Sequence, residues 1–168
     1  MESYRLANLL HDIERKVVLR QRLADVDLSG MDLRGVDFTE SHMLGVNFEG
    51  ANLEGANFTY VRTVAVTPTG APQRSSNRLF RFDVDDDDSK DDFSINFRNA
   101  NLTGTNFFAA RISDADFRSS NVRDANLFGF KAFNCDFSGA VLRGSDLGGA
   151  SLYGRFVGAD FSHSLMQK

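Results

Sequence analysis

The sequence predicts an all-β fold: a parallel β-helix (solenoid) of about five coils, with an N-terminal capping helix and a long inserted loop. The first observation is a repeat of five residues, in which a small residue at position one precedes a large apolar centre at position three. The second is the composition of 16 Phe, no Trp and two Pro, which indicates a repeated apolar role for Phe. A period of five matches neither the ~3.6-residue period of an α-helix nor the alternation of a flat strand. It fits a short extended segment, with positions one and three facing inward, followed by a turn.

The repeat falls into two blocks, residues 24–60 and 95–163. From Val26 the units read VDLSG, MDLRG, VDFTE, SHMLG, VNFEG, ANLEG and ANFTY. From Ile95 they read INFRN, ANLTG, TNFFA, ARISD, ADFRS, SNVRD, ANLFG, FKAFN, CDFSG, AVLRG, SDLGG and ASLYG, and after the loss of one residue GRFVG and ADFSH. Positions two, four and five are mostly Asp or Asn, Ser, Thr or Arg, and Gly, which favour turns and contact with water.

This pattern resembles the pentapeptide-repeat family, whose consensus is A(D/N)LXX, over about 105 of the 168 residues. The resemblance implies a right-handed quadrilateral β-helix with four units per coil, so that centres 20 residues apart form interior columns. The sequence supports this spacing, because Phe97, Phe117 and Phe137 then share one column, and like residues share most of the others. We therefore expect one domain, residues 1–168, whose ends need covering.

The sequence predicts different structures at the two ends of the chain. Residues 4–22 place five apolar side chains at helical spacing: Leu6, Leu9, Leu10, Ile13 and Val17. We expect this helix to cap the N-terminal mouth of the solenoid, with a partner-binding or membrane-surface helix as the alternatives. At the other end, Leu165 and Met166 either close the last coil or form the seam of a homodimer.

Residues 61–94 interrupt the repeat. They include the turn-forming run TPTGAP at 67–72 and six clustered carboxylates: Asp85, Asp86, Asp87, Asp88, Asp91 and Asp92. Mutual repulsion of these carboxylates favours a solvated segment. A docking loop for a protein partner and a weak divalent-cation site are the alternatives. The EF-hand-like frame that begins at Asp83 has Asp88 in place of the turn Gly and Ser94 in place of the last Glu, which argues against tight Ca²⁺ binding.

Position four of each unit predicts the outer surface of the C-terminal coils. Arg98 and Arg118 fall on one face, and Arg123 and Arg143 on the next. The other two faces carry aromatic side chains, which form our candidate protein-contact surface: Phe108, Phe128, Phe133 and Tyr153. The predicted occupants are the chain's own insertion, a second copy of the chain, or a foreign protein.

We predict no catalytic, cofactor-binding or metal site. The residues His11, His42 and His163 lack metal-ligand spacing. Cys135 occupies the small position one, which predicts a buried and unreactive thiol. Catalytic carboxylates need a desolvating cleft, and a convex rod offers none. The sequence therefore predicts a protein that is not an enzyme and carries no cofactor.

The net charge and the lengths of the apolar runs argue against two further kinds of partner, nucleic acid and membrane. The net charge of −4 and the pI of about 5.3 argue against direct nucleic-acid binding. No apolar run approaches the ~20 residues of a membrane span, and the N-terminus does not resemble a secretory signal peptide. A single Cys135 fits a reducing compartment, so we expect a cytoplasmic protein.

Two functions remain. The first is a non-enzymatic scaffold that binds an unidentified protein. The second comes from the resemblance: quinolone-resistance members of the family mimic DNA and bind type II topoisomerases such as gyrase. Residues 24–60, with seven acidic residues against one Arg, favour such a mimic, and so does the acidic run at 85–92. The Arg residues of the C-terminal coils argue against it. The sequence favours the scaffold.

Overall fold

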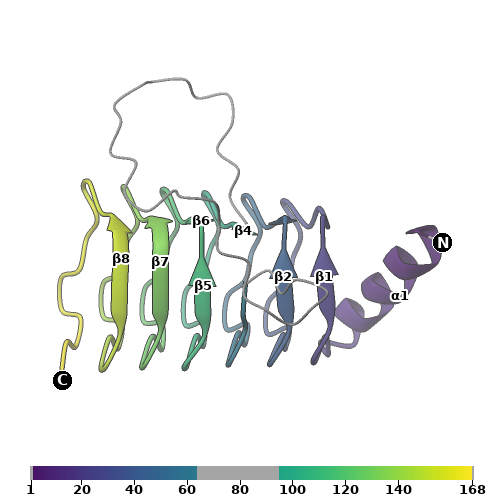
Figure 1. Ribbon diagram of the computed structural model, residues 1–168, viewed down its shortest axis with the longest axis horizontal. Coiled ribbons are helices and arrows are strands. Elements are labelled where there is room, and N and C mark those ends of the chain that lie inside the picture. Colours follow the sequence, from purple (N-terminus) through teal and green to yellow (C-terminus); the bar gives the residue numbers. More distant parts are fainter. Residues whose placement is uncertain (1, 64–94, 168) are drawn as a thin grey trace, which may run out of the picture.

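The computed structural model describes residues 2–63 and 95–167. Helix α1 (Glu2–Glu14) stands at one end, and short strands follow in parallel rows along the long axis (Figure 1). The strands are β1 (Arg22–Ala24), β2 (His42–Leu44), β3 (Val46–Asn47), β4 (Ile95–Asn96), β5 (Arg111–Ser113), β6 (Ala115–Asp116), β7 (Lys131–Asp136) and β8 (Ser151–Arg155). All strand pairs are parallel, in the orders β1-β2 and β3-β4-β6-β7-β5, with β8 also on β7. The fold is a right-handed quadrilateral β-helix of about five turns.

Each coil has four flat sides, one unit to a side, which we number faces 1 to 4 in chain order. Face 4 holds β1, β2, β5 and the first halves of β7 and β8, and face 1 holds β3, β4 and β6. The centres of face 1 are Leu28, Phe48, Phe97, Phe117, Phe137 and Phe156; of face 2, Leu33, Leu53, Leu102, Val122, Leu142 and Phe161; of face 3, Val18, Phe38, Phe58, Phe107, Leu127 and Leu147; of face 4, Leu23, Met43, Thr63, Ile112, Ala132 and Leu152. The predicted spacing of 20 residues is confirmed on both sides of the insertion, across which Arg62 pairs with Arg111.

The corners follow from the polar positions of the repeat. On faces 1 to 3, nearly every Asp or Asn at position two accepts a hydrogen bond from the backbone N–H of position four, as Asn126 Oδ1 does from Phe128 N at 3.1 Å; Asn121 is an exception. Position five then has a positive φ, as at Gly30 (64°) and Asn99 (56°). Gly and Asn adopt this left-handed conformation most readily, which explains their frequency there.

The core is a set of stacked rings. Along face 1, successive Phe rings lie nearly parallel: the centroids of Phe97 and Phe117 are 4.8 Å apart and those of Phe117 and Phe137 4.5 Å apart. Face 3 opposes them edge to face, with Phe107 6.0 Å from Phe97. One unit inverts the pattern, because Phe130 at position one and Ala132 at the centre are both buried. The large and the small residue exchange places, so the interior volume is conserved.

Three predicted boundaries were wrong. Helix α1 ends at Glu14, well before the predicted residue 22, and Lys16 takes a positive φ of 62°. The next unit already belongs to the solenoid, since Val17 bridges Asp37 and Val18 is fully buried. Leu9 and Ile13 of α1 join the same core, so the helix covers the N-terminal coil.

The insertion and the C-terminus also differ from the prediction. Residues 61–63 continue face 4: Val61 is buried, and Thr63 Oγ1 accepts a hydrogen bond from Ser113 N at 2.6 Å. At the far end the ladder continues past residue 163, because Leu147 N donates to Leu165 O at 2.7 Å. In each case a unit without the consensus residues still occupies its place in a coil.

The predicted loss of one residue is confirmed between β7 and β8. Phe133 pairs with Tyr153 but Cys135 pairs with Gly154, so Asn134 has no register partner in β8. A Cβ atom on Gly154 would lie 1.8 Å from the carbonyl oxygen of Cys135. Gly154 therefore allows the shorter unit to pass over the longer one, and the face 1 column continues with Phe137 and Phe156 stacked at 5.2 Å.

Candidate protein-contact surface

The predicted outer aromatics pair as expected. The rings of Phe108 and Phe128 stack at 6.0 Å and 10°, and those of Phe133 and Tyr153 at 5.4 Å and 6°. Phe128, Phe133 and Tyr153 are 49%, 44% and 60% exposed, while Phe108 is half-buried. Their role in binding remains a prediction. The geometry adds that these large apolar side chains are held in fixed stacks while still exposed to solvent.

The two stacks occupy the two corners that bound face 4. Phe108 and Phe128 end face 3 units, so they line the corner before face 4, and Phe133 and Tyr153 line the corner after it. Tyr60 was not predicted as part of this surface; its ring meets Phe108 edge to face at 5.7 Å and lengthens the first stack. Tyr60 is at position five of its unit, whereas the outer surface was predicted from position four. Face 4 is thus framed by aromatic side chains on both sides.

The outward side chains of face 4 were also missed. Position two of this face carries four cations and one His in direct register: Arg22, His42, Arg62, Arg111 and Lys131. We call this column the basic ladder. The insertion hides it in the sequence, because Arg62 and Arg111 are 49 residues apart although they are neighbours in space. All five are exposed except Lys131, which is half-buried.

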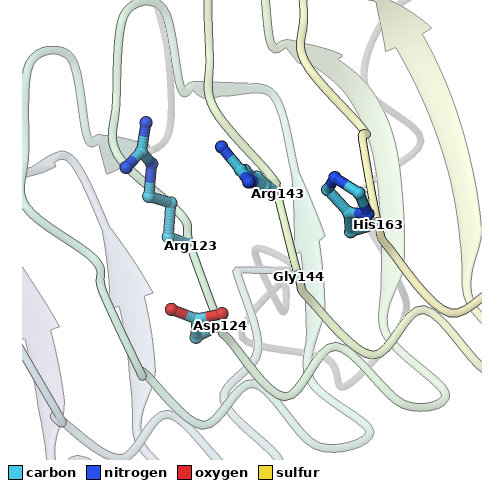
Figure 2. A pocket seen from close by; sticks show the side chains of 5 residues that line it. All are labelled: Arg123, Asp124, Arg143, Gly144 and His163. Carbon is cyan, nitrogen blue, oxygen red and sulfur yellow. The ribbon is translucent and has the colours of Figure 1, made fainter.

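A second basic group lies at the end of face 2, beside its corner with face 3. Arg123 and Arg143 extend from consecutive coils, with His163 in the next coil and Asp124 beside them (Figure 2). They line an open depression of about 290 Å³. This confirms that the predicted Arg column of face 2 is continuous, but the depression is shallow. The predicted acidic contact residues, Asp85 to Asp88, Asp91 and Asp92, lie outside the described residues.

The described residues hold little reactive chemistry. The Cys135 thiol is buried, as predicted, and burial raises its pKa to about 12. The buried carboxylate of Asp116 is paired with Arg118, 2.7 Å from Oδ2 to Nη2, which is a structural arrangement. Within residues 2–63 and 95–167, no group of three or more His, Cys, Asp or Glu is placed to hold a metal ion. Among the same residues, no helix is long and apolar enough to cross a membrane.

The stacked four-sided coils define a class of protein, the quadrilateral β-solenoids built from five-residue units. The model of the family described as pentapeptide repeats matches residues 22–59, 94–124 and 120–154 with eight copies. The chain belongs to the pentapeptide-repeat family.

Several solved structures are similar to this chain. One is a trypsin-treated variant of QnrB1, a plasmid-mediated fluoroquinolone resistance protein, with 20% identity, a TM-score of 0.46, and 88% of this chain and 75% of that chain covered. Another is Rfr23 from the cyanobacterium Cyanothece 51142, with 16% identity, a TM-score of 0.29 and coverage of 96% and 99%. A third is HetL from Nostoc sp. strain PCC 7120, involved in heterocyst differentiation regulation, with 15% identity, a TM-score of 0.21 and coverage of 94% and 92%. No curated protein sequence matches the chain.

Proposed function

We propose that this chain is a non-enzymatic interaction protein that binds a protein partner through face 4 and its two aromatic corners. The observation that carries the proposal is the pair of stacked aromatic columns formed by Phe108 with Phe128 and by Phe133 with Tyr153. Of these four side chains, Phe128, Phe133 and Tyr153 are exposed. Aromatic side chains supply much of the binding energy at protein interfaces. Because stacking already restricts these rings, binding costs little further side-chain entropy.

Position-resolved photocrosslinking tests this proposal. A benzophenone amino acid replaces Phe128 or Tyr153 on the corners of face 4, and Val157 on face 1 serves as the matched control because it is 72% exposed. We expect one and the same partner protein to crosslink from Phe128 and Tyr153 in a lysate of the source cells, and excess unlabelled protein to suppress the adduct. Equal crosslinking from Val157, or none from either corner, would contradict the proposal.

A DNA mimic is the second candidate, and one feature of the described surface favours it. Exposed carboxylates lie on faces 1 and 2 of two consecutive N-terminal coils, where Arg34 pairs with one of them: Asp27, Asp32, Glu49 and Glu54. The mimic predicts that purified protein inhibits gyrase supercoiling, or protects it from a quinolone, and that D27N/D32N/E49Q/E54Q abolishes the effect. Absence of both effects at stoichiometric excess would eliminate this candidate.

A further inference from the structure

The basic ladder differs in composition from position two of the other three faces. On faces 1 to 3, position two is mostly Asp or Asn, whose side-chain oxygen caps the corner; Asn106 Oδ1, for example, accepts from Phe108 N at 3.0 Å. Arg or Lys cannot accept such a bond. Face 4 does not need this cap, because its position-four residues pair within the strand ladder, as Ala24 does with Leu44 and Ser113 with Phe133. The corner therefore leaves position two of this face free to carry Arg or Lys.

The ladder also places like charges side by side. Arg62, Arg111 and Lys131 are direct register partners in successive coils, about 4.8 Å apart along the axis. Like charges directly opposite one another on neighbouring strands destabilise a sheet. Residues that break a local rule against stability commonly serve a function, because folding alone would select against them.

No ion pair within the described part of the chain involves the ladder. The pairs there join Arg20 to Glu40, Arg34 to Asp32, Arg118 to Asp116 and Arg155 to Asp136. The ladder is also narrow, because carboxylates lie at both corners of face 4: Glu40 on one side, and Asp25 and Asp114 on the other. A partner must therefore be both anionic and slender.

The flanking rings restrict the partner further. Phe128 is covered on one side by Phe108, and on the other its ring lies so near Gly148 that an added Cβ would be 2.8 Å from Cδ2. Phe133 and Tyr153 stack on each other. Nucleobases bind by stacking on open ring faces, which Phe128 does not offer. Ring edges carry partial positive charge and favour carboxylates.

We propose that the basic ladder binds an extended acidic peptide segment of a partner protein, with its Asp and Glu side chains directed at Arg22, Arg62, Arg111 and Lys131. The proposal rests on the proposed function and names the partner's chemistry. The four steps of the ladder span ~19 Å, which an extended segment of about six residues covers. The aromatic corners then pack against the apolar parts of the same segment.

The test uses a fluorescein-labelled decamer of Glu and the chain of residues 1–168, with binding followed by fluorescence anisotropy at low salt. The ladder variant is R62Q/R111Q/K131Q. The matched control, R98Q/R123Q/R143Q, removes the same charge from faces 1 and 2. Each exposed ion pair is worth about a few-fold in affinity, so we expect the ladder variant to bind about tenfold more weakly and the control within about twofold of the original. Added salt weakens binding by the original protein. No measurable binding, or equal losses in both variants, would overturn the proposal.

Two further arms separate other occupants. A labelled dT decamer that binds more tightly than the Glu decamer would identify the ladder as a nucleic-acid site and overturn the proposal. A variant with Asn in place of the six Asp residues of 85–92 tests the chain's own acidic run. Unchanged affinity for the peptide supports an external partner. A gain in affinity of tenfold or more would instead indicate that the acidic run at 85–92 itself occupies the ladder.

The two proposals fail separately. Crosslinking from Phe128 and Tyr153 without peptide binding to the ladder leaves the interaction protein standing and removes the acidic-peptide partner. Peptide binding that depends on the ladder, without crosslinking at the corners, removes the aromatic contact surface instead.

Discussion

Replacing Phe117 with Ala tests the interior column most severely. Phe117 is 1% exposed and stacks on both sides, against Phe97 at 4.8 Å and Phe137 at 4.5 Å. Its removal leaves a cavity that neighbouring coils cannot close, because backbone hydrogen bonds hold them at a fixed spacing. We expect a loss of ~3–5 kcal/mol in the free energy of unfolding, as for other buried Phe to Ala substitutions.

Phe156 provides the matched control at the end of the same column. Its ring is half-buried, stacks on Phe137 at 5.2 Å and meets the tilted ring of Phe161 at 5.8 Å. Because it has lost only part of its contact with water and has one stacked neighbour, we expect F156A to cost ~1–2 kcal/mol. F117L, which refills much of the cavity, should cost ~1.5 kcal/mol or less.

The assay is urea unfolding followed by far-ultraviolet circular dichroism, which gives a free energy of unfolding and an m-value for each of the three variants. A lower m-value in F156A alone would indicate that the last coil opens before the rest, as the nearest-neighbour contacts of a solenoid permit. Equal losses for F117A and F156A would refute the reasoning, because a continuous column requires an interior ring to contribute more than a terminal one.

The remaining predictions concern the bulge, the thiol and the carboxylates. G154A should lower the free energy of unfolding by ~2–3 kcal/mol, because the new Cβ meets the Cys135 carbonyl. G158A is the control: Gly158 has a φ of 68° and open space around it, so this substitution should cost ~1 kcal/mol. Similar losses for the two variants in urea unfolding would contradict the steric account. Cys135 should not react with a thiol reagent at pH 8 in the folded protein and should react fully in guanidinium, because burial raises its pKa to about 12; rapid reaction of the folded protein would contradict this. The pKa of Asp27 is lowered chiefly by side-chain hydrogen bonding with Ser29, and that of Asp160 by the backbone N–H of Ser162. A lowered folded pKa stabilises the protein above the unfolded value of ~4, and this stability is lost as pH falls through the folded pKa. D27N/D160N keeps the capping oxygens, so its urea midpoint should fall less than that of the original between pH 7 and pH 3, and an equal fall would refute this assignment.

Much of the fold was predictable because the residues at positions one and three of most units show by their size and polarity that they face inward. The small first residue and large centre recur in most units, and the 20-residue columns follow once four units form a coil. The prediction failed where a unit lacks these marks. Val18 belongs to a unit without Asp or Asn, and Thr63 places a hydroxyl inside, where its hydrogen bonds with Ser113 satisfy it. Backbone pairing with the neighbouring coil determines these units more than their own residues do.

The candidate site was only half predictable for a related reason. The stacks of Phe108 with Phe128 and of Phe133 with Tyr153 lie within one uninterrupted block, so counting by 20 found them. The basic ladder crosses the insertion, and its members Arg62 and Arg111 become neighbours only when the coils stack on either side of it. The unit at 61–65 lacks the consensus residues and runs directly into the interruption, so the sequence alone does not place Arg62 in the column.

The most direct test of the central claim, that face 4 is the docking surface, is an amide nuclear magnetic resonance titration of the ¹⁵N-labelled protein with the Glu decamer. We expect the largest shift changes in β1, β2, β5 and the first half of β7, and at the aromatic corners beside them. The amides near Arg98, Arg123 and Arg143 on faces 1 and 2 should remain unchanged. Changes confined to faces 1 and 2, or spread evenly over every basic residue, would contradict the claim.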